Sequence, residues 1–575
     1  LQWADRDSLE LLKALTRGAN TPPCLLICTL SATQHEHIEE TVGPLLREHQ
    51  SRVINISPLE PDEQEAMVLG LLGEEINQTE PFWTESDGNP LFLTEMARYV
   101  RDRDESLPRG TSLRLRDVLL DRFSRLHEAA RLLLQLAAIA GTATPLWVLG
   151  TAASLSHVQR ERAFAMLRGA SLVRVAMHGH EPWIQPYHDR IQRTIIETAS
   201  ESEFLELHTN MALALERWEG AAAHAMARHW AAAKRPQAAA QYLVTAAAEA
   251  FEKLAFDRAA ELYAEAIETS SFDGEKLQTL LRSQAKALAS AGRHYEAAVT
   301  YRQAAQVATS VDKARMLRFV AENLLRCGRI DEGLKTLAEA LEGMGEKVPL
   351  THAQARRSLI WRRIQVTLRG LEFTERDESE IAARHLEWLD TLHATSSTLA
   401  MLDHIRGGAV QARHLLAALQ FGEPKRAYRA LAMEATFLAT ANSSSAGRAG
   451  HISQMVTKRA QKMNDPYLYG VAAMARGSVA FWVGHFNEAA VAFQEAERIA
   501  RDDLIGAEWE RITSRYFYCM SHINMGSYND AAEAVTRFVD DAQRRRDAYA
   551  ANLFRTQPSC WRLLRADMPE EALEQ

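Results

Sequence analysis

The dipeptide Gly-Lys occurs nowhere in the 575 residues of this sequence. A phosphate-binding loop of the G-x-x-x-x-G-K-[ST] type requires it, because the lysine of that loop contacts the β- and γ-phosphates of the nucleotide. The chain as it stands is therefore not expected to hydrolyse ATP. No residue of the sequence is predicted to be catalytic.

Cysteine is scarce and odd in number, which argues against a disulfide framework. The spacing of the cysteines also excludes a cluster of metal ligands, so no metal site is predicted. Reduced thiols in a cytoplasmic protein are the favoured interpretation. The five cysteines are Cys24, Cys28, Cys327, Cys519 and Cys560.

The sequence also has no excess of positive charge and no long apolar run. Its formal net charge of −9 gives no overall attraction to nucleic-acid phosphates, so no nucleic-acid partner is favoured. The longest weakly polar stretch, residues 136–153, contains a Gly141-to-Pro145 turn signal. Two buried helices are therefore predicted there, and no integral membrane segment is expected.

The overall composition is that of an average globular protein, with 47% hydrophobic and 25% charged residues. Such a chain can build a core, and its length calls for several domains or a repeat array. Two short β-like runs, at residues 24–30 and 52–56, enclose a helical pattern. This β-α-β alternation predicts the last part of a parallel α/β sheet. From residue 61 onward the pattern is helical with few exceptions.

A local pattern recurs from residue 201 onward: an aromatic or apolar residue, then Asp or Glu, then alanines or a glycine. Copies lie roughly 40 residues apart, and several follow a glycine that permits a tight turn. This pattern is typical of the second helix of a tetratricopeptide repeat, in which alanine lets helices approach closely. The sequence predicts stacked antiparallel helices with close contacts at Ala259, Ala297, Ala489 and Ala531.

Residues 353–421 interrupt the repeats, and they begin with a basic amphipathic segment. Its arginines are accompanied by Trp361 and Leu368. A solvated helix face is the favoured interpretation, with an acidic partner or a membrane surface as alternatives. Acidic residues at 372–380 are predicted to neutralise the segment. The arginines are Arg356, Arg357, Arg362, Arg363 and Arg369.

Two motifs carry a family resemblance. Leu1 to Asp5 reads Leu-Gln-Trp-Ala-Asp without an initiator methionine, which predicts that the chain is part of a longer protein. Residues 87–95 read Asp-Gly-Asn-Pro-Leu-Phe-Leu-Thr-Glu. Both resemble segments of STAND-type ATPases, the signalling branch of the AAA+ and Orc1-like ATPases. The whole length resembles the C-terminal part of a multidomain bacterial serine/threonine protein kinase with a STAND module and tetratricopeptide repeats.

The resemblance implies a mainly α chain with four parts. Residues 1–60 would be the C-terminal remnant of an α/β P-loop nucleotide-binding domain, and residues 61–110 a helical lid. Residues 111–200 would form a winged helix, and residues 201–575 a tetratricopeptide-like α-solenoid. Within the winged helix, His188 is expected to be a packed, hydrogen-bonded residue.

The resemblance also implies the cofactor and its contacts. ATP and Mg²⁺ would bind the full-length parent, with Asp5, Gly88, Asn89 and Pro90 near the nucleotide, although this chain alone is not expected to bind either well. An ordinary helix-start turn is the structural alternative at Gly88 to Pro90. The family usually places a γ-phosphate-sensing arginine where this sequence has Ser31, which puts hydrolysis by the parent in doubt.

The expected function is a regulatory and scaffolding region that couples a STAND switch to protein binding by the solenoid and controls kinase output. A STAND-family transcriptional regulator and a tetratricopeptide scaffold with a vestigial ATPase are the alternatives. The expected partners are proteins. Nucleotide-dependent self-association of the parent is a further expectation.

Overall fold

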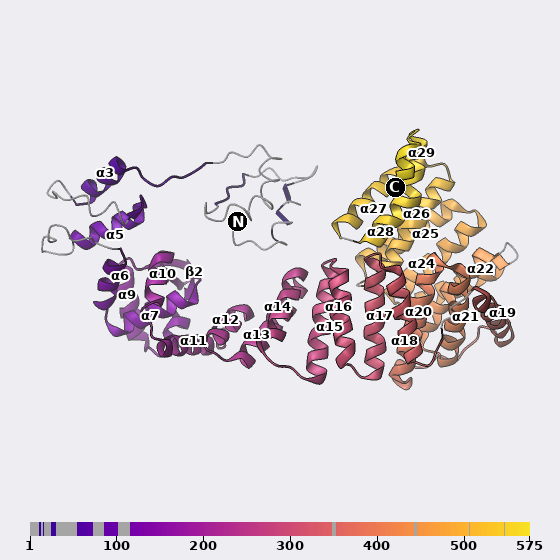
Figure 1. Cartoon of the computed structure of the whole chain (residues 1–575), viewed down its shortest axis with the longest axis horizontal. Helices are drawn as coiled ribbons and strands as arrows, with labels where there is room; N and C mark the ends of the chain where they lie inside the picture. The colour runs from indigo at the N-terminus through magenta and orange to yellow at the C-terminus, as the bar shows by residue number, and fades with distance from the viewer. Residues whose placement is uncertain are drawn as a thin grey trace. The chain divides into compact units, whose positions relative to one another are not determined.

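The computed structural model describes residues 54–72, 86–101, 115–347, 352–441, 445–504, 506–545 and 547–574, with short pieces at 8, 11–12, 15–16 and 25–29. The chain forms two compact units, which meet in sequence near residue 258. We call residues 1–258 the N-terminal unit and residues 272–575 the repeat unit. The predicted mainly α fold is confirmed (Figure 1).

Only parts of the two predicted N-terminal strands are described. Residues 25–29 and 54–56 have no assigned strand pairing in the described structure. The α/β remnant at residues 1–60 therefore stays a prediction.

The described part of the N-terminal unit starts with two helices that pack against each other, α3 (Pro61–Leu72) and α5 (Pro90–Arg101). They lie in the segment predicted as a lid. Hydrophobic residues from both helices join the core of the helices that follow, which includes Val68, Leu93 and Met96.

The segment predicted as a winged helix combines helices with a three-stranded antiparallel sheet of order β1-β3-β2. Strands β2 and β3 form a hairpin, with Val173 opposite Pro186 and His178 opposite Glu181. Its elements are α6 (Leu115–Ser124), α7 (Glu128–Ala140), β1 (Thr144–Pro145), α8 (Leu146–Ala152), α9 (His157–Gly169), β2 (Val173–His178), β3 (Glu181–Pro186) and α10 (Asp189–Ile196).

Residues 136–153 fold as the sequence predicts, as two helices with a turn between them. Helix α7 ends at Gly141, whose φ of 73° is left-handed, and α8 begins at Leu146. Within the described ranges no helix combines the length and the apolar character that a bilayer crossing requires. Three further helices follow in the unit: α11 (Glu201–Leu215), α12 (Ala223–Ala232) and α13 (Pro236–Glu252).

The first half of the repeat unit is a stack in which each helix packs on the next one in sequence. The predicted alanines are fully buried, Ala297 in α16 of this stack and Ala259 in the preceding helix α14. Alanine lets helix backbones approach closely because its side chain is small. The stack consists of α15 (Gly274–Ser290), α16 (His294–Val307), α17 (Ser310–Arg326) and α18 (Ile330–Gly343), and α14 (Phe256–Thr269), which precedes it, is divided between the two units.

The same stacking returns near the C-terminus. Ala489 and Ala531 are buried there, and Gly484 and Gly526 turn the chain with φ of 93° and 78°. The helices are α24 (Pro466–Val483), α25 (Phe486–Asp502), α26 (Glu508–Asn524), α27 (Tyr528–Arg544), α28 (Ala548–Phe554), a π-helical turn at Arg555–Ser559, α29 (Cys560–Arg565) and α30 (Pro569–Glu574).

Between these stacks the order of packing changes, where the sequence predicts irregularity. Helix α19 packs on α21, while α20 packs on α17, α18 and α21. Helix α22 contacts both α23 and α24. The elements are α19 (His352–Arg369), a 3-10 turn at Glu378–Glu380, α20 (Ala383–Leu402), α21 (His404–Phe421), α22 (Pro424–Ala441) and α23 (Ala446–Met463).

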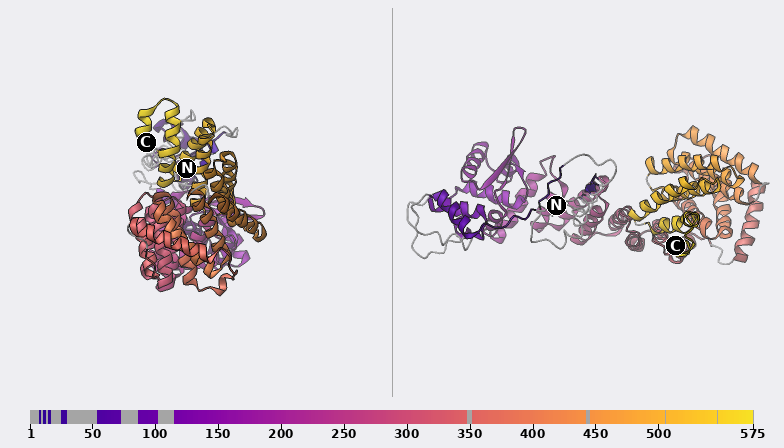
Figure 2. Two further views of the ribbon diagram at one scale, coloured as in Figure 1. Left: turned by 90° about the vertical axis from the view of Figure 1, so that its right-hand side faces the viewer. Right: turned by 90° about the horizontal axis from the view of Figure 1, so that it is seen from above.

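The C-terminal stack of the repeat unit reaches back to the first stack, because α28 contacts α17 (Figure 2). The C-terminal helices therefore cover part of α17, a surface that an open stack of repeats would leave exposed.

Replacement of Ala297 by leucine tests the repeat register. The added methylene groups have no space between α16 and its neighbours, so the free energy of unfolding should fall by about 1–3 kcal/mol. Urea denaturation followed by circular dichroism measures this change. The matched control is Val299→Leu, at an exposed position of the same helix, which should leave the midpoint unchanged. An unchanged midpoint for Ala297→Leu would contradict the register.

Candidate functional site

The predicted nucleotide-contact turn is present as a helix start. Gly88 has a left-handed φ of 71°, the amide of Asn89 donates to the carbonyl of Ser86 at 2.8 Å, and Pro90 is the first residue of α5. Proline suits this position because the first helical amide has no partner within the helix. Asp5 lies outside the described residues. Nucleotide contact by Gly88, Asn89 and Pro90 stays a prediction.

Glycine is required in this turn because the turn lies against the chain that enters α3. The amide of Leu59 donates to the carbonyl of Gly88 at 2.9 Å. A Cβ atom on Gly88 would lie 2.6 Å from Cβ of Pro58. Gln64 Nε2 donates to the carbonyl of Leu59 at 2.7 Å, and Ser86 Oγ donates to Gln64 Oε1 at 3.2 Å. These bonds join the starts of the two lid helices.

Glu95 connects helix α5 to the helices that follow it. Its buried carboxylate pairs with Arg98 at 3.2 Å and with Arg122, which also donates to the carbonyl of Ala170. An open pocket of about 460 Å³ lies beside this junction. Its charged lining residues are Arg98, Arg101, Arg122, Arg125 and Asp121. Arg98 and Arg122 share the carboxylate of Glu95, and Arg125 pairs with Asp121 at 2.8 Å, so the charges of these side chains are already paired.

His188 is packed and hydrogen-bonded, as the sequence predicts. Its Nδ1 accepts from the amide of Arg190 at 3.1 Å and caps α10, and its ring meets the ring of Phe92 edge-on at 5.2 Å. Burial lowers the pKa of His188, which favours the neutral ring that a cap acceptor needs. His188 therefore holds the backbone at the start of α10, and this structural role explains the residue without catalysis.

The basic segment is helix α19, and three of its arginines are bonded within the repeat unit. Arg362 pairs with Glu346 at 3.3 Å, Arg363 pairs with Glu434, and Arg369 donates to the carbonyl of Leu419 at 2.9 Å. These ion pairs place the neutralising acids at Glu346 and Glu434, while the prediction placed them at 372–380. The reason is tertiary, since α19 packs on α21.

The opposite face of α19 is apolar and exposed. We call it the α19 stripe, and it consists of Ile360, Trp361, Ile364 and Leu368, which are 56%, 61%, 45% and 83% exposed. Their spacing places them along one side of the helix. Arg356 and Arg357, also exposed, lie one turn before the stripe. An apolar stripe next to two cations is a surface suited to a partner.

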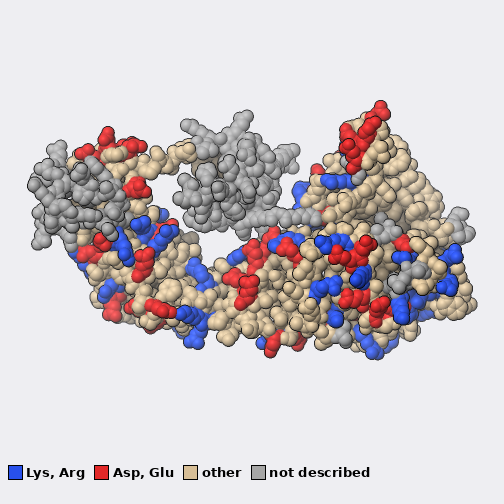
Figure 3. All heavy atoms as spheres, viewed as in Figure 1, with Lys and Arg blue, Asp and Glu red and all other residues tan. Residues whose placement is uncertain are grey.

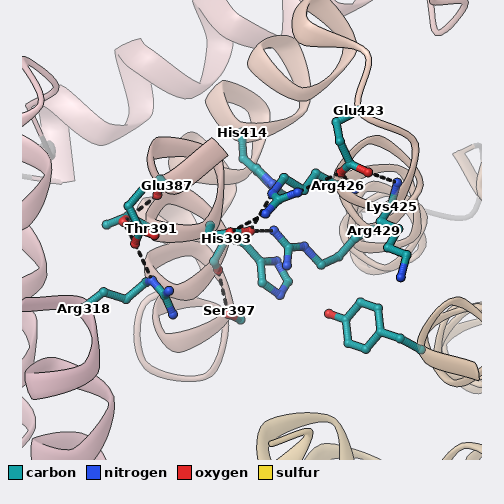
Figure 4. A network of polar contacts seen from close by, with 12 residues as sticks. Arg318, Glu387, Thr391, His393, Ser397, His414, Glu423, Lys425, Arg426 and Arg429 are labelled. Carbon is teal, nitrogen blue, oxygen red and sulfur yellow. Dashed lines mark hydrogen bonds and ion pairs between the residues drawn. The ribbon is translucent and has the colours of Figure 1, made fainter. Parts of the chain in front are cut away.

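A second candidate site lies at the centre of the repeat unit, where ionic groups are buried between helices (Figure 4). The carboxylate of Asp390 on α20 accepts from Arg426 at 3.0 Å and from Arg429 at 2.6 Å, both on α22. One turn earlier, Glu387 accepts from Arg315 and Arg318 of α17, each at 2.9 Å. Helix α20 is thus tied to a different helix through each carboxylate.

The pKa values of this cluster reflect its burial and its charge. Burial alone would raise the pKa of Asp390, but the guanidinium groups of Arg429 and Arg426 lower it to about 2. Burial, with Arg429 nearby, lowers the pKa of His414 to about 3. Burial also lowers the pKa of His393 well below its usual range. The carboxylate is therefore ionised and both histidines are neutral at pH 7.

A pocket of about 110 Å³ opens beside this cluster, between α20, α21, α22, α24 and α26. One end is polar, where Tyr467 Oη donates to Glu510 Oε1 at 3.0 Å and burial raises the pKa of Glu510. The other walls are mostly apolar, with Met433, Phe437, Val471, Met474, Ala475, Trp482 and Phe517 among the lining residues.

Three residues that line this pocket each carry a buried polar atom with no hydrogen-bond partner within the described structure: His393 Nδ1, Arg429 Nε and Trp509 Nε1. Buried polar atoms are normally paired, so each calls for an explanation. Sequence reasoning missed this pocket. The available signal was polar residues one helical turn apart in apolar surroundings, as in Asp390 with His393 and Arg426 with Arg429.

The sequence matches no protein-family model and no curated protein sequence. Among solved structures, the chain is similar to the Signal Transduction ATPase with Numerous Domains (STAND) protein with a tetratricopeptide repeat sensor from Pyrococcus horikoshii. The identity is 11% and the TM-score 0.39, over 90% of this chain and 71% of that one. A likeness of this strength assigns neither a family nor a function to this chain.

The buried His414 predicts a pH dependence of stability. Its folded pKa of about 3 lies below the ordinary value of 6.5, so the unfolded chain binds a proton first as the pH falls. The stabilisation is fully present above pH 6.5 and is lost as the pH falls toward 3. From pH 7.5 to 5 the loss should reach about 2 kcal/mol from this residue.

Urea denaturation at both pH values, for the wild type and for His414→Gln, measures this contribution. The variant should show a smaller fall between the two pH values, whatever its own stability. His451→Gln, at an exposed position of α23, is the matched control and should retain the wild-type fall. Equal falls in the wild type and His414→Gln would contradict a neutral buried His414.

Proposed function

We propose that this chain is the regulatory and scaffolding region of a STAND-type signalling protein, whose repeat unit docks a protein partner. The α19 stripe carries the proposal. Large apolar residues on an otherwise charged helix cost solubility unless a partner covers them. The surface of α17 is a weaker candidate, because α28 already contacts that helix.

The partner we propose is an acidic amphipathic helix. Ile360, Ile364 and Leu368 follow one another at intervals of one helical turn, a spacing that a second helix can match with its own apolar residues. Arg356 and Arg357 at one end of the stripe would attract carboxylates on the partner. Trp361 would be the anchor, because buried aromatic residues supply a large share of interface binding energy.

Nucleic acid is not the ligand that the surface favours. Lys and Arg side chains alternate with Asp and Glu over the face of the repeat unit in Figure 3. Binding to a phosphate backbone requires several unopposed cations, and the net charge of −9 opposes it. This argues against the transcriptional-regulator alternative.

We further propose that the parent protein contains a nucleotide switch and a kinase whose output this region controls. We propose, from the whole-length resemblance, that the parent is a cytoplasmic serine/threonine kinase, and, from the resemblance of the two N-terminal motifs to STAND ATPases, that it binds ATP and Mg²⁺ and self-associates with nucleotide. A scaffold with a vestigial ATPase is the alternative, and Ser31 in place of the arginine favours it.

Fluorescence anisotropy with a designed peptide tests the docking surface. The peptide is an amphipathic helix of about 18 residues, with leucines one turn apart and glutamates on its flanks, and a scrambled peptide of the same composition is its control. Trp361→Ala and Leu368→Ala should each weaken binding about tenfold. Val491→Ala, at an exposed position of α25, should not change it.

Arg356→Glu with Arg357→Glu should weaken binding most at low salt, because exposed charges act over a distance that salt shortens. Equal binding of the designed and scrambled peptides would overturn the docking proposal. So would binding that survives loss of Trp361 and Leu368.

A further inference from the structure

The central pocket of the repeat unit has the size of a small ligand. Its volume of about 110 Å³ is of the order that accommodates a single six-membered ring. Apolar side chains from three helices form its walls, among them Met433 and Phe437 of α22, Val471 and Met474 of α24, and Phe517 of α26. An aromatic ring would fill these walls and gain from each contact.

The polar end offers both donors and acceptors. Trp509 Nε1–H and Arg429 Nε–H are donors without partners within the described structure, and each belongs to a residue that lines the pocket. His393 Nδ1 has no partner either, and one of the two nitrogens of a neutral histidine ring is a hydrogen-bond acceptor. Glu510 keeps a second oxygen beyond the one that Tyr467 contacts. A ligand with one acceptor and one donor would satisfy groups that the protein leaves unpaired.

The charge around the pocket argues against an ionic ligand. Arg429 already pairs with Asp390, and Asp390 is shared with Arg426, which also pairs with Glu423 at 3.1 Å. A further anion would enter without a free cation beside it, which is costly in a buried site. Glu510 has no ion pair among the described residues, and burial raises its pKa, which favours its neutral form over a carboxylate that would hold a cation. An uncharged polar group carries no such cost.

We infer that this pocket binds an uncharged, single-ring aromatic compound with an amide-type group, whose oxygen accepts from Trp509 and Arg429 and whose N–H donates to Glu510 or His393. The ring lies against the apolar walls. The five helices that contribute lining residues, α20, α21, α22, α24 and α26, come from both the irregular middle and the C-terminal stack, so the ligand contacts both parts at once.

Calorimetric titration of the 575-residue chain with phenylacetamide tests this inference. Saturable binding at or below a few millimolar is expected, since a ligand of about ten non-hydrogen atoms reaches only modest affinity. Phenylacetate, which adds a charge, and toluene, which lacks the amide, should each bind at least about tenfold more weakly. No saturation by phenylacetamide up to about 20 mM would overturn the inference.

Trp509→Phe removes one donor and keeps the ring, so it should weaken phenylacetamide binding about tenfold and leave toluene binding unchanged. The matched control is Trp388→Phe. Trp388 Nε1 also has no hydrogen-bond partner in the described structure, but Trp388 does not line the pocket. Equal weakening by both variants would overturn the assignment, as would tighter binding of phenylacetate than of phenylacetamide.

Discussion

The repeat unit depends on the buried pairing of Asp390 with Arg426 and Arg429. A carboxylate removed from water is stable only when cations and hydrogen bonds replace its solvation, and two guanidinium groups do this here. The lowered pKa of Asp390 shows that the ionised form is favoured despite burial. The pairing fixes helix α20 against α22, and Glu387 fixes the same helix against α17.

Helix α20 is therefore the joint between two regular stacks of helices. Helix α20 packs on α17 and α18, where the next helix in sequence, α19, would lie in a regular stack. Helix α19 therefore packs on α21. That displacement leaves the α19 stripe exposed on one side, while Arg362, Arg363 and Arg369 are bonded on the other. The same arrangement places His393 and Arg429 at the wall of the central pocket. Both proposed binding surfaces thus follow from one helix that leaves the repeat order.

The sequence predicted the parts of the fold that depend on local patterns. Alanine at close contacts, glycine at left-handed turns and the break at residues 353–421 could all be read from spacing. The turn at Gly88 to Pro90 could be read as well, because its residue types each suit one backbone position. These features need only neighbours along the chain.

The ionic joint and the pocket could not be predicted, because their partners lie far apart in sequence. The acids that neutralise α19 are examples, since Glu346 and Glu434 reach it only through tertiary packing. Likewise, Asp390 and His393 read as ordinary polar positions of a helix until α22 and α26 are placed beside them. The nucleotide-binding role of the N-terminal motifs rests on their resemblance to STAND ATPases. The structure supplies only the geometry of the turn at Gly88 to Pro90.

Hydrogen exchange of Asp390→Asn, measured by mass spectrometry on the full chain, tests the central claim most directly. The isosteric change removes the ion-pair partner of Arg429 and leaves Arg426 with Glu423 and Glu378 only, so amides of α20 and α22 should lose protection, while those of α15 and α16 keep theirs. Asp502→Asn, which removes an exposed acid paired with Arg501, should change neither region. Unchanged protection of residues 383–441 in Asp390→Asn would contradict the claim that this pairing holds the repeat unit together.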